Sequence, residues 1–322
     1  METGRLSPHP DSLELLTVTW AGDAEQFRLL RTSLARSALV DLPHRVVVHT
    51  EDLPLFTDPA PSLDFRTTAQ VLPGNLETLR LQARDWQRRL GRHGTKWMSS
   101  LTRAPGGPSW PRYLGWHVQQ ISKLACVAQS EATTVLVLDS DVIVTAQARV
   151  ADFLHPSQAV CLERFGPAHK ATGKVGKWNR TAHHLLEVPL DAEADVDLYF
   201  DTPFPMHPPS VRALMAWLEN RYQQPWWQTL LAQPPRRWSE FATYRLFLRQ
   251  HPPASGIKWM APTLTRYVYD ATDPDALIKH LHELMIEPDC HYVTLHSQSS
   301  GRGLWDAKDV IPKVSALFTA DT

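Results

Sequence analysis

The sequence has little cysteine, and the few residues present are far apart. Cys126, Cys161 and Cys290 are the only cysteines among 322 residues. An odd number without a close-spaced pair is not typical of a disulfide framework, and it favours reduced thiols in a cytoplasmic protein. Cys290 is followed by His291, but a structural zinc ion requires four ligands at compact spacing, so a zinc site is not favoured.

The sequence also lacks an excess of charge and any long hydrophobic run. The formal net charge is −1, whereas a protein that neutralises many phosphates normally carries a basic excess, so nucleic acid is not an expected partner. No apolar run approaches the roughly 20 residues that span a bilayer. Residues 1–11 are polar and lack the apolar core of a signal peptide. We therefore expect a cytoplasmic protein without a transmembrane segment, for which only peripheral membrane contact stays open.

A strand, helix, strand pattern opens the chain. Leu13–Thr19 and Arg45–His49 are predicted strands, and the helix between them carries Phe27, Leu30 and Leu34 at helical spacing. This order is typical of the first half of a nucleotide-binding α/β fold. No repeat or long linker interrupts the rest, so we expect a flexible N-terminus over residues 1–12 and one domain over residues 13–316.

Further along the chain, residues 53–63 are rich in proline and acid and predict a loop. A basic amphipathic helix is expected next, whose Arg88, Arg89 and Arg92 form either a solvated face or a contact with an anionic surface. This basic helix is predicted over Asn75–Leu90. The other predicted elements are a helix over Gly115–Gln129 and short strands over Val196–Phe200, Thr265–Tyr269 and Tyr292–Leu295.

The most informative segment joins a buried strand to two acids. The apolar run Thr133–Leu138 leads directly into Asp139, Ser140 and Asp141. A continuous run rich in β-branched residues is typical of a strand buried on both faces of a parallel sheet, and ligands gather outside the carboxyl ends of such strands. Paired carboxylates there suit magnesium or manganese, which complete their coordination with phosphate oxygens and water. A solvated Asp-Ser turn is the alternative.

Together with the first strand, the Gly22-Asp23 turn and the helix bearing Trp116, Gln120 and Lys123, this motif is similar to that of a poorly characterised group of bacterial glycosyltransferases of the GT-A fold. The resemblance covers about residues 13–310. It implies a single α/β domain with a Rossmann-like, mostly parallel sheet and helices on both faces. Residues 13–145 would bind a nucleotide sugar, and residues 146–316 would bind the acceptor and supply a C-terminal metal and diphosphate loop.

The resemblance implies transfer of a sugar from a nucleoside diphosphate, such as a UDP-sugar, to a hydroxyl of a saccharide or glycoside. Asp139 and Asp141 would hold Mn²⁺ or Mg²⁺, and His296 is the candidate third ligand, which favours manganese. Arg302 would contact the diphosphate, although the related enzymes often place lysine there and at a different spacing. The implied donor contacts are Thr19, Gln120, Lys123, Asp139, Ser140, Asp141 and Arg302.

Two helices carry the remaining candidates. In Gly115–Gln129, Trp116, Gln120 and Lys123 align opposite the apolar face and either reach the nucleotide or form a solvated flank. Near Ser239, a predicted N-cap, Glu240 is the candidate catalytic base or a hydrogen-bonding partner of the acceptor. The helix field at that position opposes the raised pKa that a base prefers. The implied acceptor contacts are Trp238, Glu240 and Tyr244.

Two other classes of function stay open from the sequence. The strand followed by Asp139 and Asp141 also fits a haloacid-dehalogenase-type phosphatase, in which Asp139 is the nucleophile and Asp141 the acid/base. In that family, however, the aspartate pair usually lies near the start of the fold. A non-catalytic sugar-binding protein is the third class.

Overall fold

The structure is a computed structural model, and it describes residues 12–56, 60–101, 114–191, 193–268, 273–296 and 307–318. Its central sheet has the strand order β3-β2-β1-β4-β9. The first four strands are parallel, and β9 is antiparallel to β4. The strands of this sheet are β1 (Leu13–Val18), β2 (His44–Val48), β3 (Leu63–Thr67), β4 (Thr134–Val137) and β9 (Phe204–Met206).

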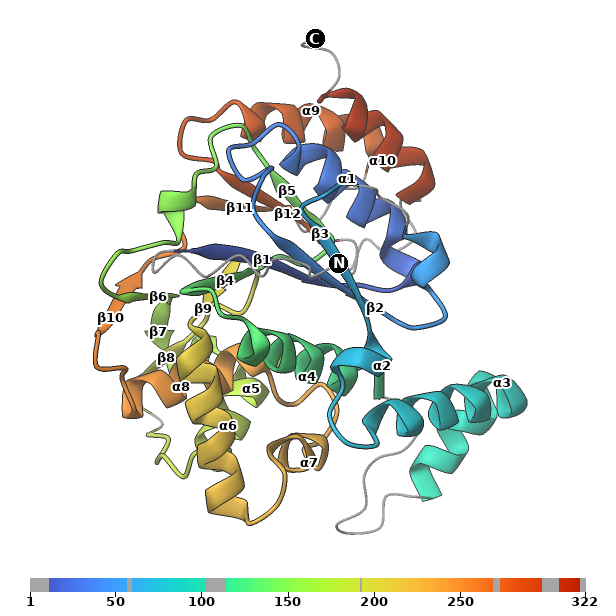
Figure 1. The fold of residues 1–322 in the computed structure, drawn as a ribbon, viewed down its shortest axis with the longest axis vertical. Helices are drawn as coiled ribbons and strands as arrows, with labels where there is room; N and C mark the ends of the chain where they lie inside the picture. The colour runs from blue at the N-terminus through green and yellow to red at the C-terminus, as the bar shows by residue number, and fades with distance from the viewer. Residues whose placement is uncertain are drawn as a thin grey trace, which may run out of the picture.

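Helices cover both faces of this sheet (Figure 1). On one face lie α1 (Ala24–Leu34), α9 (Pro274–Met285) and α10 (Ala307–Ala316); on the other lie α4 (Leu114–Gln129), α6 (Pro208–Tyr222), α7 (Trp226–Leu231) and α8 (Glu240–Gln250). The predicted α/β class, with a mostly parallel sheet between helices, is confirmed. The remaining helices are α2 (Thr68–Val71), α3 (Leu76–Leu101) and α5 (Gly173–Leu185).

Smaller sheets extend the core. A three-stranded sheet has the order β11-β12-β5, and two strand pairs, β10-β6 and β7-β8, complete the structure described. None of the described helices has the length and apolarity that a bilayer crossing requires. These strands are β5 (Val142–Val144), β6 (Ala159–Leu162), β7 (Phe165–Pro167), β8 (Asp195–Asp197), β10 (Ile257–Met260), β11 (Thr265–Val268) and β12 (Tyr292–Leu295).

Several predicted boundaries differ from the observed ones for local reasons. The strand expected over Val196–Phe200 ends at Asp197, because the Asp197 carboxylate accepts a hydrogen bond from the backbone N–H of Tyr199 at 2.9 Å and turns the chain. The helix expected over Asn75–Leu90 continues to Leu101 across a kink at Gly91, where φ is 63°. The predicted loop over residues 53–63 overlaps the start of β3 at Leu63.

His44 is a buried polar residue at the start of β2. Its Nε2 lies 2.9 Å from Thr17 Oγ1, and its Nδ1 lies 3.2 Å from Arg31 Nη1. The guanidinium can only donate, so Nδ1 accepts and Nε2 carries the proton of a neutral ring. Burial, with a smaller effect from Arg31, lowers the pKa of His44 from 6.5 to about 3. The ring is therefore uncharged in the folded protein at neutral pH.

This burial predicts a pH dependence of stability. The folded pKa lies below the unfolded value, so the stabilising effect is complete above pH 6.5 and is lost as the pH falls toward 3. Between pH 6.5 and 4.5, the wild type should lose on the order of 2 kcal/mol more unfolding free energy than His44→Gln. Urea denaturation at both pH values checks this. Parallel losses in the two proteins would contradict it.

Candidate active site

The candidate site lies where the strand order of the central sheet reverses. From β1 the chain proceeds to β2 and β3 on one side, and then returns to β4 on the other side of β1. In open parallel sheets this reversal leaves a crevice outside the carboxyl ends of the two central strands. Thr19 follows β1 and Ser140 follows β4, and their hydroxyls form a buried hydrogen bond of 2.8 Å. Two predicted donor-binding residues therefore meet at the strand-order reversal.

The Asp139-Ser140-Asp141 segment also joins two sheets. β4 ends just before it in the central sheet, and β5 begins just after it in the three-stranded sheet. The backbone N–H of Leu295 on β12 donates to the carbonyl of Asp141 at 2.8 Å. This pairing brings His296, the residue after β12, to the same end of the sheets as the two aspartates.

A further acid, Asp201, lies at the same place. It precedes β9, whose start is beside the end of β4 because the two strands are antiparallel. Asp201 Oδ1 lies 3.7 Å from His296 Nε2, and the neighbouring Thr202 hydroxyl accepts a hydrogen bond from the Asp139 backbone N–H at 3.2 Å. The sequence interpretation missed Asp201, which stands between short segments without a strong periodic pattern.

The acids repel one another electrostatically. Burial raises the pKa of the Asp141 carboxyl well above its usual range, and the charge of Asp139 raises it further. Asp23 and Asp201 add smaller effects in the same direction. Burial lowers the pKa of His296 despite the opposing influence of Asp201, which favours the neutral imidazole that a metal requires. The site thus concentrates negative charge beside a neutral imidazole.

Lys123 on α4 supplies a positive charge beneath this cluster. Its Nζ lies 2.9 Å from Asp139 Oδ1 and 3.2 Å from Glu240 Oε1, and its side chain is 2% exposed. Burial disfavours the ammonium, but the two carboxylates outweigh this effect and hold the pKa of Lys123 above its ordinary value. Gln120, one turn earlier on α4, donates to the Glu240 carboxylate through its amide group.

These contacts exclude one of the two alternatives for α4 and correct the expectation for Glu240. Gln120 and Lys123 of α4 do not form a solvated flank, because both side chains are buried and contact Glu240 at the start of α8. The pKa of Glu240 is raised by its burial, although Lys123 opposes the shift, so burial outweighs the helix field that was expected to lower it. Ser239 does cap the helix, accepting from the backbone N–H of Phe241 at 3.2 Å.

Trp238 and Tyr244, the predicted acceptor contacts, are both 0% exposed. The Trp238 carbonyl accepts a hydrogen bond from Trp116 Nε1 at 3.0 Å, and the Tyr244 hydroxyl accepts one from the His207 backbone N–H at 2.8 Å. A contact with an acceptor requires accessible atoms, which neither side chain has in this structure. Both residues pack the helices that support the site. Arg302 lies outside the described residues.

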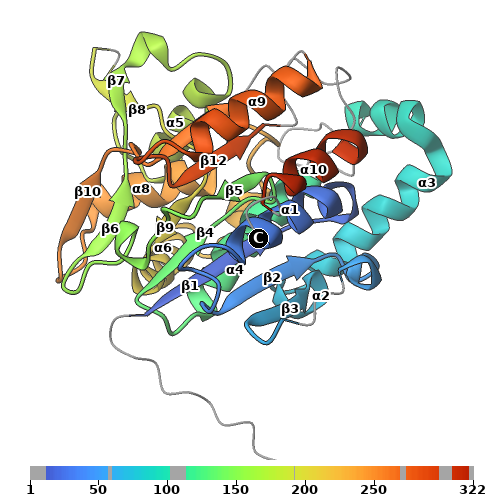
Figure 2. The same ribbon diagram turned by 90° about the horizontal axis from the view of Figure 1, so that it is seen from above.

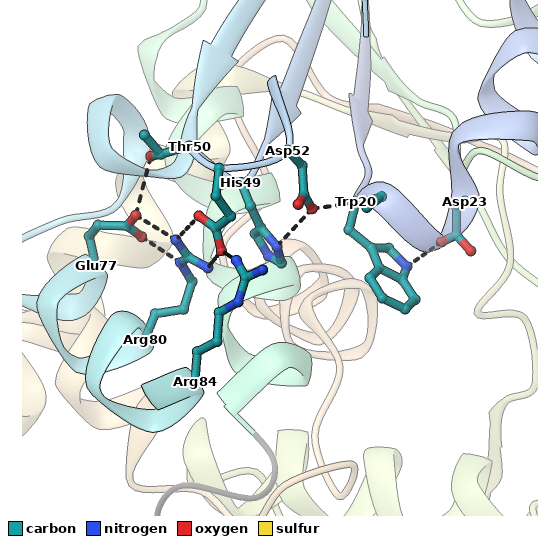
Figure 3. Close-up of polar contacts among 10 residues, drawn as sticks. Trp20, Asp23, His49, Thr50, Asp52, Glu77, Arg80 and Arg84 are labelled. Carbon is teal, nitrogen blue, oxygen red and sulfur yellow. Dashed lines mark hydrogen bonds and ion pairs between the residues drawn. The ribbon is translucent and has the colours of Figure 1, made fainter. Parts of the chain in front are cut away.

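One group of three potential metal ligands converges to within 4.8 Å in the described part of the chain, and it is not the predicted one. It consists of His49, Glu51 and Asp52 on the loop after β2. Glu51 is already paired with Arg80 and Arg84, and Asp52 accepts from the Ala21 backbone N–H (Figure 3). The two arginines neutralise Glu51, and the Ala21 N–H occupies one oxygen of Asp52, so this group fastens the loops after β1 and β2 together rather than offering open ligands.

Trp20 is an exposed residue directly after Thr19. Its ring is 49% exposed, and Nε1 donates to the Asp23 carboxylate at 2.7 Å (Figure 3). A Cβ atom on Gly22 would lie 2.4 Å from this ring, so glycine is required for the ring to fold over the turn. The sequence interpretation identified the Gly22-Asp23 turn but missed Trp20.

Comparison with known proteins gives a family match and a distant structural likeness. Residues 16–271 match the model of a family described as being of unknown function (DUF6492). Curated protein sequences give no match. Among solved structures, the galactosyltransferase LgtC, determined in complex with donor and acceptor sugar analogues, is 10% identical, with 94% of this chain and 95% of that chain covered and a TM-score of 0.40. A likeness this distant carries no information about the activity of this chain.

The buried ion pairs of Lys123 predict a large effect of its replacement. Lys123→Met leaves the carboxylates of Asp139 and Glu240 without their cation and should reduce the unfolding free energy by about 3–5 kcal/mol. Adding Glu240→Gln should restore part of this loss, because it removes one uncompensated charge. Urea denaturation at pH 7 measures both, with Lys279→Met, at an 80% exposed side chain, as the control. If Lys123→Met were as stable as Lys279→Met, the assignment of the buried ion pairs to Lys123 would be contradicted.

Proposed function

Because the chain belongs to DUF6492, a family whose function is not known, its activity must be argued from the site, and we propose that it is a metal-dependent glycosyltransferase. The donor is a nucleoside-diphosphate sugar, such as a UDP-sugar, and the acceptor is a hydroxyl of a saccharide or glycoside. The observation that carries this proposal is the position of Asp139 and Asp141 at the strand-order reversal, beside the hydrogen-bonded Thr19 and Ser140.

The donor atoms available suit a divalent cation that also binds phosphate oxygens. Asp139 and Asp141 offer carboxylates and His296 offers a neutral imidazole, a set that favours Mn²⁺ and accommodates Mg²⁺. Burial, reinforced by the charge of Asp139, raises the pKa of Asp141, and a cation at this place would stabilise the ionised carboxylate. When bound, the cation would neutralise the charge that develops on the departing diphosphate.

The buried residues beneath this cluster position it. Lys123 holds Asp139 through a 2.9 Å ion pair and thereby fixes the direction of one carboxylate oxygen. Glu240 balances the charge of Lys123 and is itself held by Gln120. The 2% exposure of Glu240 supports this positioning role more strongly than a role as the base that deprotonates an acceptor. Gln120 and Lys123 would then act on the donor through Asp139.

The test is the release of nucleoside diphosphate from a panel of nucleotide sugars in the presence of Mn²⁺. Asp139→Asn and Asp141→Asn should each reduce turnover at least about a hundredfold, because cation binding at the leaving group is lost. The matched control is Asp289→Asn, at a 77% exposed side chain, which should keep wild-type turnover. Melting temperatures should show that all variants fold.

Each other outcome has a distinct meaning. Wild-type turnover in Asp139→Asn and Asp141→Asn would remove the pair from the mechanism. Phosphate release from a generic phosphate ester, without nucleotide-sugar turnover, would replace the proposal by a phosphatase. Saccharide binding with neither activity would replace it by a sugar-binding protein.

A further inference from the structure

Helix α3 is fastened to the body at its first turns. Arg80 donates to Glu51 at 2.7 and 2.8 Å and to Glu77 at 2.7 Å, and its side chain is 6% exposed (Figure 3). Arg84, one turn later, also pairs with Glu51. Since Glu51 lies on the loop after β2, this network fixes the start of α3 at the carboxyl edge of the central sheet.

Beyond these turns, α3 extends away from the body (Figures 1 and 2). Its apolar residues Leu79, Ala83, Trp86 and Leu90 have the spacing of a single helix face. Leu79 packs against the core and Ala83 is 3% exposed, whereas Trp86 is 43% and Leu90 is 36% exposed. The apolar stripe that packs α3 against the body therefore continues along the helix to Trp86 and Leu90, which are accessible to solvent.

The accessible part of the stripe lies within a basic segment. Residues 84–90 contain three basic side chains, Arg84, Arg88 and Arg89, against a single acid, Asp85, in a chain whose formal net charge is −1. Arg88 and Arg89 are exposed, and Arg89 pairs with Asp85 at 2.8 Å while its side chain stays 70% exposed. Positive charge is thus concentrated around Trp86 and Leu90.

We propose that this exposed part of α3 binds the surface of an anionic lipid bilayer. An interfacial helix combines a tryptophan and large aliphatic side chains, which enter the boundary of the acyl chains, with arginines that meet the anionic head groups. Trp86 and Leu90 supply the first component, and Arg88 and Arg89 supply the second. The basic surroundings favour this partner over a second copy of the chain, because two such segments would repel each other.

The attachment of α3 gives this binding a consequence for the candidate site. The fastening loop follows β2, and the site residues Thr19 and Asp139 follow β1 and β4 of the same sheet. A bilayer held by α3 would therefore face the molecule from the side of its carboxyl edge (Figure 2). The membrane binding itself does not depend on the proposed enzymatic activity.

Flotation of the full chain with lipid vesicles tests the proposal. Vesicles of phosphatidylcholine with phosphatidylglycerol should bind the wild type, and vesicles of phosphatidylcholine alone should bind at least about tenfold less. Trp86→Ser combined with Leu90→Ser should lower binding to the anionic vesicles at least about tenfold. Arg88→Glu combined with Arg89→Glu should do the same, and raised salt should weaken wild-type binding.

The control is Ile286→Ser, which removes a 65% exposed apolar side chain from the end of α9 and should bind as the wild type does. All variants alter exposed residues, so their melting temperatures should match the wild type. Equal binding to neutral vesicles, equal binding by the double variants, or no wild-type binding would each overturn the proposal. Sedimentation gives a further contrary outcome. If the wild type were a dimer and the variant with Trp86→Ser and Leu90→Ser were a monomer, this face would bind a second copy of the chain instead of a bilayer.

Discussion

The ammonium of Lys123, enclosed between Asp139 and Glu240, is the interaction on which the architecture of the site depends. Removing a charged group from water costs several kcal/mol, and only close opposite charges offset this cost. The two carboxylates meet this condition at 2.9 and 3.2 Å. Since the three residues belong to α4, the end of β4 and the start of α8, their charges fix the positions of three elements relative to one another.

This arrangement divides the acids into two groups with different roles. Asp139 and Glu240 form ion pairs with Lys123. Asp141, in contrast, has the acids Asp139, Asp23 and Asp201 as neighbours. A carboxyl group whose pKa is raised by burial and by other carboxyl groups is stabilised in its ionised form by any cation that enters. Lys123 with its two carboxylates therefore holds the geometry, and Asp141 is the acid whose ionised form a cation would stabilise. This division supports the proposed glycosyltransferase chemistry.

The parts of the fold that the sequence predicted are those with a strong local pattern. β1, β2, β4 and β12 are apolar runs buried in sheets, and α1 and α4 have clear helical periodicity, so local residues determine these elements. β3 has a mixed sequence at the edge of the sheet, and its three-dimensional pairing with β2 defines it. The pairing of β5 with β12, which brings His296 near the aspartates, is equally non-local.

The residues of the candidate site were likewise predictable only where a local sequence pattern marks them. The motif Asp139-Ser140-Asp141 was visible because it follows a buried strand directly, and Thr19 and Ser140 do meet at the strand-order reversal. The burial of Lys123 was not visible, because a lysine opposite the apolar face of a helix has the pattern of a solvated residue until a second helix covers it. Asp201 and Trp20 depend on antiparallel pairing and on the fold of a turn around Gly22.

The most direct test of the central claim is isothermal titration calorimetry of Mn²⁺ into the protein in the presence of saturating UDP. The account predicts that the wild type takes up one cation and that Asp141→Asn takes up none, while the thermal stability of the metal-free variant shows that it is folded. Absence of Mn²⁺ uptake by the wild type, or equal uptake by Asp141→Asn, would contradict the account.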